Sequence, residues 1–399
     1  MSSTLLARRP ETNTATAERR PGTKLLFLVT EDWYFCSHRL PVARAARDAG
    51  FAVIVATRVR DHGDAIRREG FSLRPLAWRR RGDGIAGTVR AVGEIVRLYR
   101  AERPDIVHHV ALKPVLLGGI AARLAFPFGA GRPALLAAVM GLGSRFGGGW
   151  TARALGRAVR LAAGGGRVIV QNPDDGVALA SFGLARERIA LIRGSGVDTA
   201  HFAPLPEPAG SSLVVALVAR MLRSKGVLDA ISAVRRLRAD GVAVELLLAG
   251  PTDPDNPDSL DAAALRALAA EPGVTWLGHV ADVRGVWARA QVAVFPSTYG
   301  EGVPKALLEA AACGRPIVAA DMPGSREVVR HGQTGLLVPP GDIIALADAI
   351  TALAGDPAAR AAMGAAGRAL TETEFAEAIV AAQTLALYRA MLAERPVPA

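Results

Sequence analysis

The feature that most constrains this chain is an alternation of short, continuous apolar runs with longer segments of helical periodicity. In the first half, strand-like runs occur at 24–30, 51–57, 106–110, 134–140, 167–171 and 189–192. Continuous Val, Ile and Leu are typical of strands that are buried on both faces of a parallel sheet. Helical patterns such as 39–48 and 88–101 lie between these runs. The first half therefore predicts a parallel α/β domain.

A segment rich in Pro and Gly, 203–212, interrupts this alternation and reads as an interdomain linker. Beyond it the alternation resumes, with strand-like runs at 213–219, 244–249, 292–295 and 317–320 and helical patterns at 228–239, 260–270, 304–313 and 343–353. Ligands of such sheets bind at the carboxyl ends of the strands, so we expect the site in a cleft between two facing domains.

These patterns predict five parts of the chain. We expect a disordered basic tail, a first Rossmann-like domain, a linker, a second Rossmann-like domain and a C-terminal helix, for which a return to the first domain is one option; their bounds are 1–21, 22–203, 204–212, 213–373 and 374–399. The tail lacks the apolar core of a secretory signal. No run reaches the roughly 18 uncharged apolar residues of a spanning helix.

The charge of the chain is divided unevenly between its halves. Residues 1–203 carry 31 Lys or Arg and 16 Asp or Glu, whereas residues 204–399 carry 17 and 21. The basic half favours a polyanionic partner, and we expect an anionic membrane surface rather than nucleic acid, because no nucleic-acid module is present. Cys36 and Cys313 form no disulfide framework, which favours a reducing cytosol.

The stretch 292–321 carries most of the expected chemistry. A strand-like run leads through Glu301 and Gly302 to a helix that begins near Pro304. Free amide groups at the start of a helix favour a phosphate group. A carboxylate in the loop, Glu301, can accept hydrogen bonds from sugar hydroxyls, and one on the helix, Glu309, can bind a ribose.

A cationic loop follows the first strand of the second domain. Arg220 and Lys225 lie in it, just before a helical segment. Cations at the carboxyl end of a strand can hold a diphosphate and neutralise its charge when it leaves. The sequence thus predicts that both cations and Glu301 act on one bound, negatively charged ligand.

The context of these residues resembles retaining glycosyltransferase family 4. The chain from Glu301 reads Glu-Gly-x-Pro-x-x-Leu-Leu-Glu-Ala-x-Ala-Cys-Gly-x-Pro-Ile-Val-Ala-x-Asp, similar to the donor motif of that family. The resemblance implies the GT-B fold, with two facing Rossmann-like domains of parallel sheets. It also implies a donor site for a nucleotide sugar, which we assign to Arg220, Lys225, His279, Val280, Glu301, Gly302, Val303, Pro304, Lys305 and Glu309.

The first domain resembles the subgroup that acts on undecaprenyl-diphosphate-linked sugars in polysaccharide, O-antigen or glycan assembly. The segments that carry this likeness are Ser37-His-Arg-Leu-Pro41, 105–119 and 140–144. The resemblance implies an acceptor site at Ser37, His38, Arg39, His108, Lys113 and Gly143. Some family members carry a histidine two positions after His108, where this chain has Val110, so no catalytic histidine is assigned.

The sequence therefore predicts a retaining glycosyltransferase. It would move a hexose or N-acetylhexosamine from a nucleotide sugar, with UDP preferred, to a lipid-diphosphate-linked acceptor. We expect no cofactor and no metal ion, because Arg220 and Lys225 supply the positive charge. No second carboxylate stands where a double displacement would need it. We therefore expect same-face substitution, with Glu301, Arg220 and Lys225 as the catalytic residues.

We expect the enzyme to work at the inner face of the cytoplasmic membrane. Trp78 is followed by three arginines, which predicts an interfacial patch with the indole at headgroup depth, supported by Arg58, Arg60, Arg67 and Arg68. Two other functions stay open: a nucleotide-sugar epimerase of the same architecture, and a transferase that uses a soluble acceptor.

Overall fold

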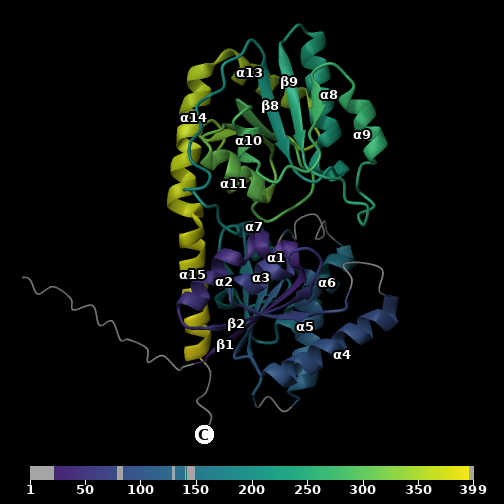
Figure 1. Cartoon of the computed structure of the whole chain (residues 1–399), viewed down its shortest axis with the longest axis vertical. Coiled ribbons are helices and arrows are strands. Elements are labelled where there is room, and N and C mark those ends of the chain that lie inside the picture. The colour runs from purple at the N-terminus through teal and green to yellow at the C-terminus, as the bar shows by residue number, and fades with distance from the viewer. Residues whose placement is uncertain (1–21, 79–83, 128–130, 140, 142–148, 395–399) are drawn as a thin grey trace, which may run out of the picture.

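The computed structural model describes residues 22–78, 84–127, 131–139, 141 and 149–394. Within them, two parallel sheets form the two α/β domains that the sequence predicts (Figure 1). The first sheet has the order β3-β2-β1-β4-β5-β6-β7. Its strands are β1 (Lys24–Glu31), β2 (Ala52–Arg58), β3 (Ser72–Pro75), β4 (Ile106–Val110), β5 (Ala134–Ala138), β6 (Arg167–Val170) and β7 (Ile189–Leu191).

Helices cover both faces of this sheet. One layer is α4 (Gly84–Glu102), α5 (Leu112–Ala125), α6 (Gly149–Ala163) and α7 (Pro173–Ser181). The other contains α1 (Asp32–His38), α2 (Leu40–Asp48) and α3 (Gly63–Arg68). Both faces are therefore apolar, and the strands read as continuous Val, Ile and Leu. Pairing is in register, with Leu25 to Val29 of β1 beside Ile106 to Val110 of β4.

The second sheet has the order β10-β9-β8-β11-β12-β13. Its strands are β8 (Leu213–Val218), β9 (Val244–Ala249), β10 (Val274–Trp276), β11 (Val292–Phe295), β12 (Ile317–Ala320) and β13 (Gly335–Val338). Its helices are α8 (Val227–Ala239), α9 (Ala262–Ala269), α10 (Arg284–Trp287), α11 (Lys305–Ala312), α12 (Pro323–Arg326), α13 (Ile343–Gly355) and α14 (Pro357–Leu370). The carboxyl ends of β8 and β11 meet because the order reverses between these two strands.

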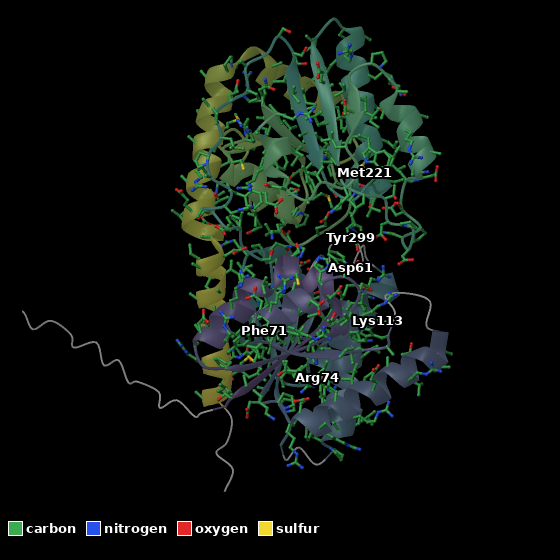
Figure 2. All side chains as sticks on the ribbon, in the orientation of Figure 1. Asp61, Phe71, Arg74, Lys113, Met221 and Tyr299 are labelled. Atoms are coloured by element: carbon green, nitrogen blue, oxygen red, sulfur yellow. The ribbon has the colours of Figure 1, made fainter. Side chains whose placement is uncertain are left out.

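The C-terminal helix joins the two domains along one side. A π-helical turn (Thr371–Phe375) connects α14 to α15 (Glu377–Ala393), which packs on α2 of the first domain. Figure 1 shows α14 beside the second domain and α15 beside the first. Tyr299 and Asp61 mark the level at which the domains face each other (Figure 2).

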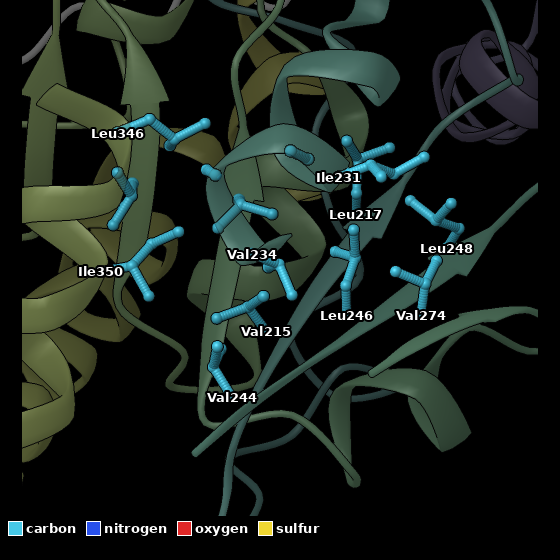
Figure 3. Packing of buried hydrophobic residues seen from close by; sticks show 14 of the residues in the cluster. Val215, Leu217, Ile231, Val234, Val244, Leu246, Leu248, Val274, Leu346 and Ile350 are labelled. Carbon is cyan, nitrogen blue, oxygen red and sulfur yellow. The ribbon is translucent and has the colours of Figure 1, made fainter. Parts of the chain in front are cut away.

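Each domain has its own hydrophobic core. In the second domain, Val215 and Leu246 on the sheet pack against Ile231 and Val234 of α8, with Ile350 of α13 beside them (Figure 3). Among the described residues, no helix combines the length and the apolar character needed to cross a membrane.

Candidate active site

The loop after β11 brings Glu301 to Lys225. The two side chains form a partly buried ion pair, and the Ser297 hydroxyl donates to the same Glu301 oxygen at 3.3 Å. The Lys225 ammonium also lies 5.1 Å from the centroid of the Phe295 ring. These two predicted catalytic residues are therefore adjacent, although they lie 76 positions apart in the chain.

A glycine makes this approach possible. Gly226 has φ of 71°, and a methyl group on its Cα would overlap the carbonyl oxygen of Pro296. The loops are also joined by backbone, because Thr298 N–H donates to the Ser224 carbonyl at 3.0 Å. Only a residue without Cβ fits both the left-handed conformation and the close contact.

Arg220 lies at the carboxyl end of β8 and forms an ion pair with Asp253. Its charge helps to lower the pKa of His38 and opposes the rise that burial causes in the pKa of Tyr34; both residues belong to the first domain. Arg220 thus lies within electrostatic reach of the first domain. The donor-site residues His279, which is exposed, and Val280, which is half-buried, follow β10 at the same edge of the second sheet.

The start of α11 differs from the prediction in two respects. Pro304 occupies the N-cap, and the helix begins at Lys305. The amide of Val303, predicted to face a phosphate, instead donates to the side-chain oxygen of Gln171 in the first domain at 3.0 Å. One of the expected phosphate-binding amides is therefore already used in an interdomain hydrogen bond.

Glu309 lies within α11 and is partly buried. Burial raises the pKa of its carboxyl to about 7, and the Glu377 carboxylate adds to the shift against the opposing charge of Lys305. At neutral pH the group is therefore divided between its neutral and charged forms. It can donate as well as accept a hydrogen bond.

The first domain contributes α1 to its interface with the second domain. The Lys305 ammonium donates to the Ser37 carbonyl at 2.7 Å, and the His38 ring stacks on Tyr34 with centroids 4.1 Å apart. Burial, with the charges of Lys305, Arg39 and Arg220, lowers the pKa of His38 to about 3. The neutral ring has a buried Nδ1 with no hydrogen-bond partner among the described residues.

Two predicted acceptor residues are buried. His108 lies inside β4 with no exposed surface, and its Nδ1 is 2.7 Å from the Tyr388 hydroxyl. Arg39 is only 3% exposed. The prediction that the His108 side chain lines the cleft is wrong, because a residue within a parallel strand points into a helix layer rather than toward the end of the sheet. The assignment of Arg39 to the acceptor site stays a prediction.

Lys113 lies in the first turn of α5, with its ammonium 5.7 Å from the Trp78 ring centroid. Trp78 itself is 3% exposed and packs in the core with Tyr99 and Ile95. The prediction that the indole reaches membrane headgroups is therefore wrong. Gly143 and the arginines 79–81 lie outside the described residues.

Several residues at this level were not predicted. The buried Asp32 carboxylate accepts from the backbone N–H groups of Arg60 at 2.7 Å and His62 at 2.9 Å, which fixes the loop after β2. The Arg60 guanidinium then reaches Asp255 of the second domain at 3.3 Å. The sequence feature that could have indicated this contact is the acidic pair Glu31-Asp32 at the carboxyl end of a buried strand. Among the described residues, no three His, Cys, Asp or Glu side chains gather as metal ligands would.

Known proteins resemble this chain in both domains. Residues 212–356 match the family model of group 1 glycosyl transferases, and residues 24–141 match that of 4-like glycosyl transferases. The α-maltose-1-phosphate synthase of Mycolicibacterium smegmatis is 32% identical over 270 residues, which is 60% of this chain and 69% of that protein.

Two further known proteins share a lower sequence identity with this chain. The capsular polysaccharide biosynthesis glycosyltransferase CapM of Staphylococcus aureus is 30% identical over 183 residues, covering 46% of this chain and 47% of CapM. The crystal structure of Anabaena Alr3699/HepE in complex with UDP and glucose superposes with a TM-score of 0.75 at 20% identity, covering 92% of this chain and 100% of that chain. At this identity the structural likeness establishes the fold.

Proposed function

Because this chain belongs to the group 1 glycosyltransferases and has the GT-B fold, we propose that it transfers a hexose or N-acetylhexosamine from a nucleotide diphosphate sugar with retention of configuration. The proposed donor is a UDP-sugar. The proposed acceptor is a lipid-diphosphate-linked sugar in the assembly of a cell-surface polysaccharide or glycan. HepE, which shares the fold, was crystallised with UDP and glucose, and CapM is named for capsular polysaccharide synthesis.

The ion pair of Lys225 and Glu301 carries this proposal. A donor diphosphate would take Lys225 from Glu301 and Arg220 from Asp253. Both cations would then lie against the negative charge that develops on the departing nucleotide. They supply this stabilisation without a metal ion. The freed Glu301 carboxylate would accept hydrogen bonds from the donor sugar, and Glu309 would bind the ribose.

The chemistry then proceeds on one face of the sugar. The bond between the acceptor oxygen and the anomeric carbon forms on the face from which the bond to the phosphate oxygen breaks. The acceptor proton passes to that departing phosphate oxygen. The configuration is retained, and no second carboxylate is required.

The acceptor would bind against α1 and the start of α5. His38 is neutral, so its ring could exchange a hydrogen bond with an acceptor hydroxyl without carrying a charge. Lys113 can pair with the acceptor diphosphate, and Ser37 lies beside Lys305. We place the enzyme at the inner face of the cytoplasmic membrane, where a lipid-linked acceptor and a cytosolic donor meet, in keeping with the basic first half of the chain.

The test is a donor screen by nucleotide release with lipid-linked acceptors. We expect Glu301→Gln and Lys225→Met to lower kcat about 100-fold or more, the usual cost of removing one group that stabilises transition-state charge. Glu271→Gln is the matched control, because Glu271 forms an exposed ion pair with Arg235 far from the cleft. Wild-type turnover in folded Glu301→Gln protein would refute the assignment.

A soluble acceptor is the second candidate. The relative with the longest match described above is a synthase of maltose 1-phosphate, which favours a phosphorylated sugar as acceptor. Nucleotide release with a sugar 1-phosphate, and none with the lipid-linked sugar, would select this alternative. A nucleotide-sugar epimerase would instead convert the donor with no acceptor present.

A further inference from the structure

The helix layer of α4, α5 and α6 forms a face with one sign of charge over much of its area. Residues 106–173, which include α5 and α6, contain no Asp or Glu and eight Lys or Arg. The three helices are neighbours, since α5 packs against both α4 and α6 (Figure 1). A surface of this kind attracts a polyanion.

Apolar side chains are exposed on the same layer. Ile120 and Leu124 of α5 are 47% and 53% exposed, and Leu161 of α6 is 61% exposed. The two helices that carry them pack against each other, and the Arg123 guanidinium of α5 donates to the Leu161 carbonyl of α6. Most of the large exposed aliphatic side chains of the described residues lie on this layer, since Ile85 and Val89 of α4 are also exposed.

A hollow of about 310 Å³ adjoins Leu161, lined by Arg123, Arg160 and Arg188. Glycines 164 and 165 form part of its wall. Arg123 is used by the fold, because it donates to backbone carbonyls. The guanidinium groups of Arg160 and Arg188 make no hydrogen bond or ion pair with any described residue. The hollow thus offers two guanidinium groups that have no partner among the described side chains, in a space large enough for the headgroup of a phospholipid.

This hollow is separate from the cleft. The segments that line it, 164–165 and 183–185, lead into β6 and β7 and therefore lie at the amino ends of these strands. The candidate active site lies at the carboxyl ends. We call the set Ile120, Leu124, Leu161, Arg160 and Arg188 the basic-apolar patch.

We propose that the layer of α4, α5 and α6 docks on an anionic phospholipid bilayer through this basic-apolar patch. The aliphatic side chains enter the boundary between headgroups and acyl chains, and Arg160 and Arg188 bind lipid phosphates. A bilayer offers both anionic and apolar groups. Nucleic acid would leave the three aliphatic side chains without a partner, and the patch has no aromatic side chain on which a base could stack.

Vesicle flotation of the full chain tests this docking, with neutral phosphatidylcholine and with vesicles that contain phosphatidylglycerol. We expect wild-type protein to partition to the anionic vesicles at least 10-fold more strongly. Arg160→Gln/Arg188→Gln should weaken this partition about 25-fold, because each arginine near an anionic surface contributes a factor of about 5. Leu124→Gln/Leu161→Gln should abolish the binding that remains at high salt.

Matched controls carry the same changes elsewhere. Arg266→Gln/Arg289→Gln alters the net charge equally at exposed positions of the second domain, and Ile344→Gln removes an exposed aliphatic side chain of α13. Thermal unfolding checks that each variant is folded. Equal partition of the patch variants and the controls would overturn the proposal.

Competition by a DNA duplex, with unchanged binding by Leu124→Gln/Leu161→Gln, would also overturn it and indicate a general polyanion surface. The flotation contains no donor or acceptor, so its failure leaves the proposed transfer reaction standing. Nucleotide release with a water-soluble acceptor should be unchanged in the patch variants. A loss there would show that the patch belongs to the transfer site instead.

Discussion

Each cation assigned to the donor diphosphate already pairs with a carboxylate in this structure. Lys225 pairs with Glu301, and Arg220 pairs with Asp253. These partly buried charges need counter-charges when no ligand is present. Under the proposed function, donor binding would exchange one set of ion pairs for another, and the exchange would release Glu301 for the sugar.

Glu309 gives a prediction at the same scale. Its carboxyl has a pKa of about 7 in the folded chain against 4.5 ordinarily, so the folded state holds the proton more tightly. The stability that this proton provides is complete below about pH 4.5 and is lost as the pH rises to about 7. We expect Glu309→Gln to remove this loss, which is at most about 3.5 kcal/mol at 1.4 kcal/mol per pH unit.

Urea unfolding at pH 5 and pH 8 measures this effect. The wild-type free energy of unfolding should fall between these pH values, and that of Glu309→Gln should fall less. Glu271→Gln, which changes an exposed carboxylate, should keep the wild-type pH dependence. The same fall in wild type and in Glu309→Gln would contradict a raised pKa at this position.

At the scale of elements, α15 attaches the second domain to the first. Tyr388 of α15 is fully buried and reaches His108 of β4, and Tyr99 of α4 reaches His109 at 2.8 Å from the other face of the same strand. Burial lowers the pKa of both imidazoles. Each neutral ring therefore ties one helix layer to the centre of the sheet.

These two pairs give a matched comparison. Tyr388→Phe and Tyr99→Phe should each lower the free energy of unfolding by about 1–2 kcal/mol, because each leaves a buried imidazole nitrogen without its partner. We expect kcat and the acceptor KM to stay within about 2-fold in both variants. A 10-fold rise in the acceptor KM for Tyr388→Phe alone, at unchanged stability, would show that His108 belongs to the acceptor site after all.

Some of the helices and strands could be predicted from the sequence, and others could not. The strands that the sequence identifies are continuous apolar runs, as β1 and β9 are, and their burial leaves a clear pattern. Short edge strands such as β3 and β10 carry no such run and were not predicted. Helix α5 is apolar on nearly every side, so its sequence lacks the amphipathic period that marks a helix at a surface.

The site follows the same logic. Loop residues with distinct chemistry, such as Glu301 and Lys225, could be placed from the sequence because each follows a strand at the carboxyl edge. The surroundings of His108 could not be predicted. The alternation of side chains along a strand decides which face of the sheet a residue points to, but not whether it lies near the end of the sheet. The interdomain partners Gln171 and Asp255 depend on the relative position of the two domains, which no local pattern encodes.

At the scale of the whole molecule, the two domains touch directly at the candidate active site. Val303 N–H donates to Gln171, and Lys305 donates to the Ser37 carbonyl. Gly141 of the first domain lies against the loop that carries Glu301, where a methyl group on its Cα would be 2.6 Å from the Gly300 carbonyl oxygen. The position of Glu301 therefore depends on both domains.

Gly141→Ala tests whether this approach is needed for catalysis. The added methyl group would push the two domains apart at the Glu301 loop, so we expect kcat to fall about 10-fold or more, while nucleotide binding to the second domain changes little. Gly131→Ala is the matched control. Gly131 has φ of 70° against 66° for Gly141, but among the described residues the atoms nearest to a methyl group on its Cα belong to the Phe126 ring, at 3.9 Å.

Both variants carry the same backbone strain, about 1–2 kcal/mol for a left-handed non-glycine residue. A similar loss of stability is therefore expected in both, and only Gly141→Ala should lose turnover. Initial rates, thermal unfolding and nucleotide titration separate the two effects. Equal turnover in the two variants would mean that catalysis does not depend on the contact between Gly141 and the Glu301 loop. The first domain would then position its substrate without touching this loop.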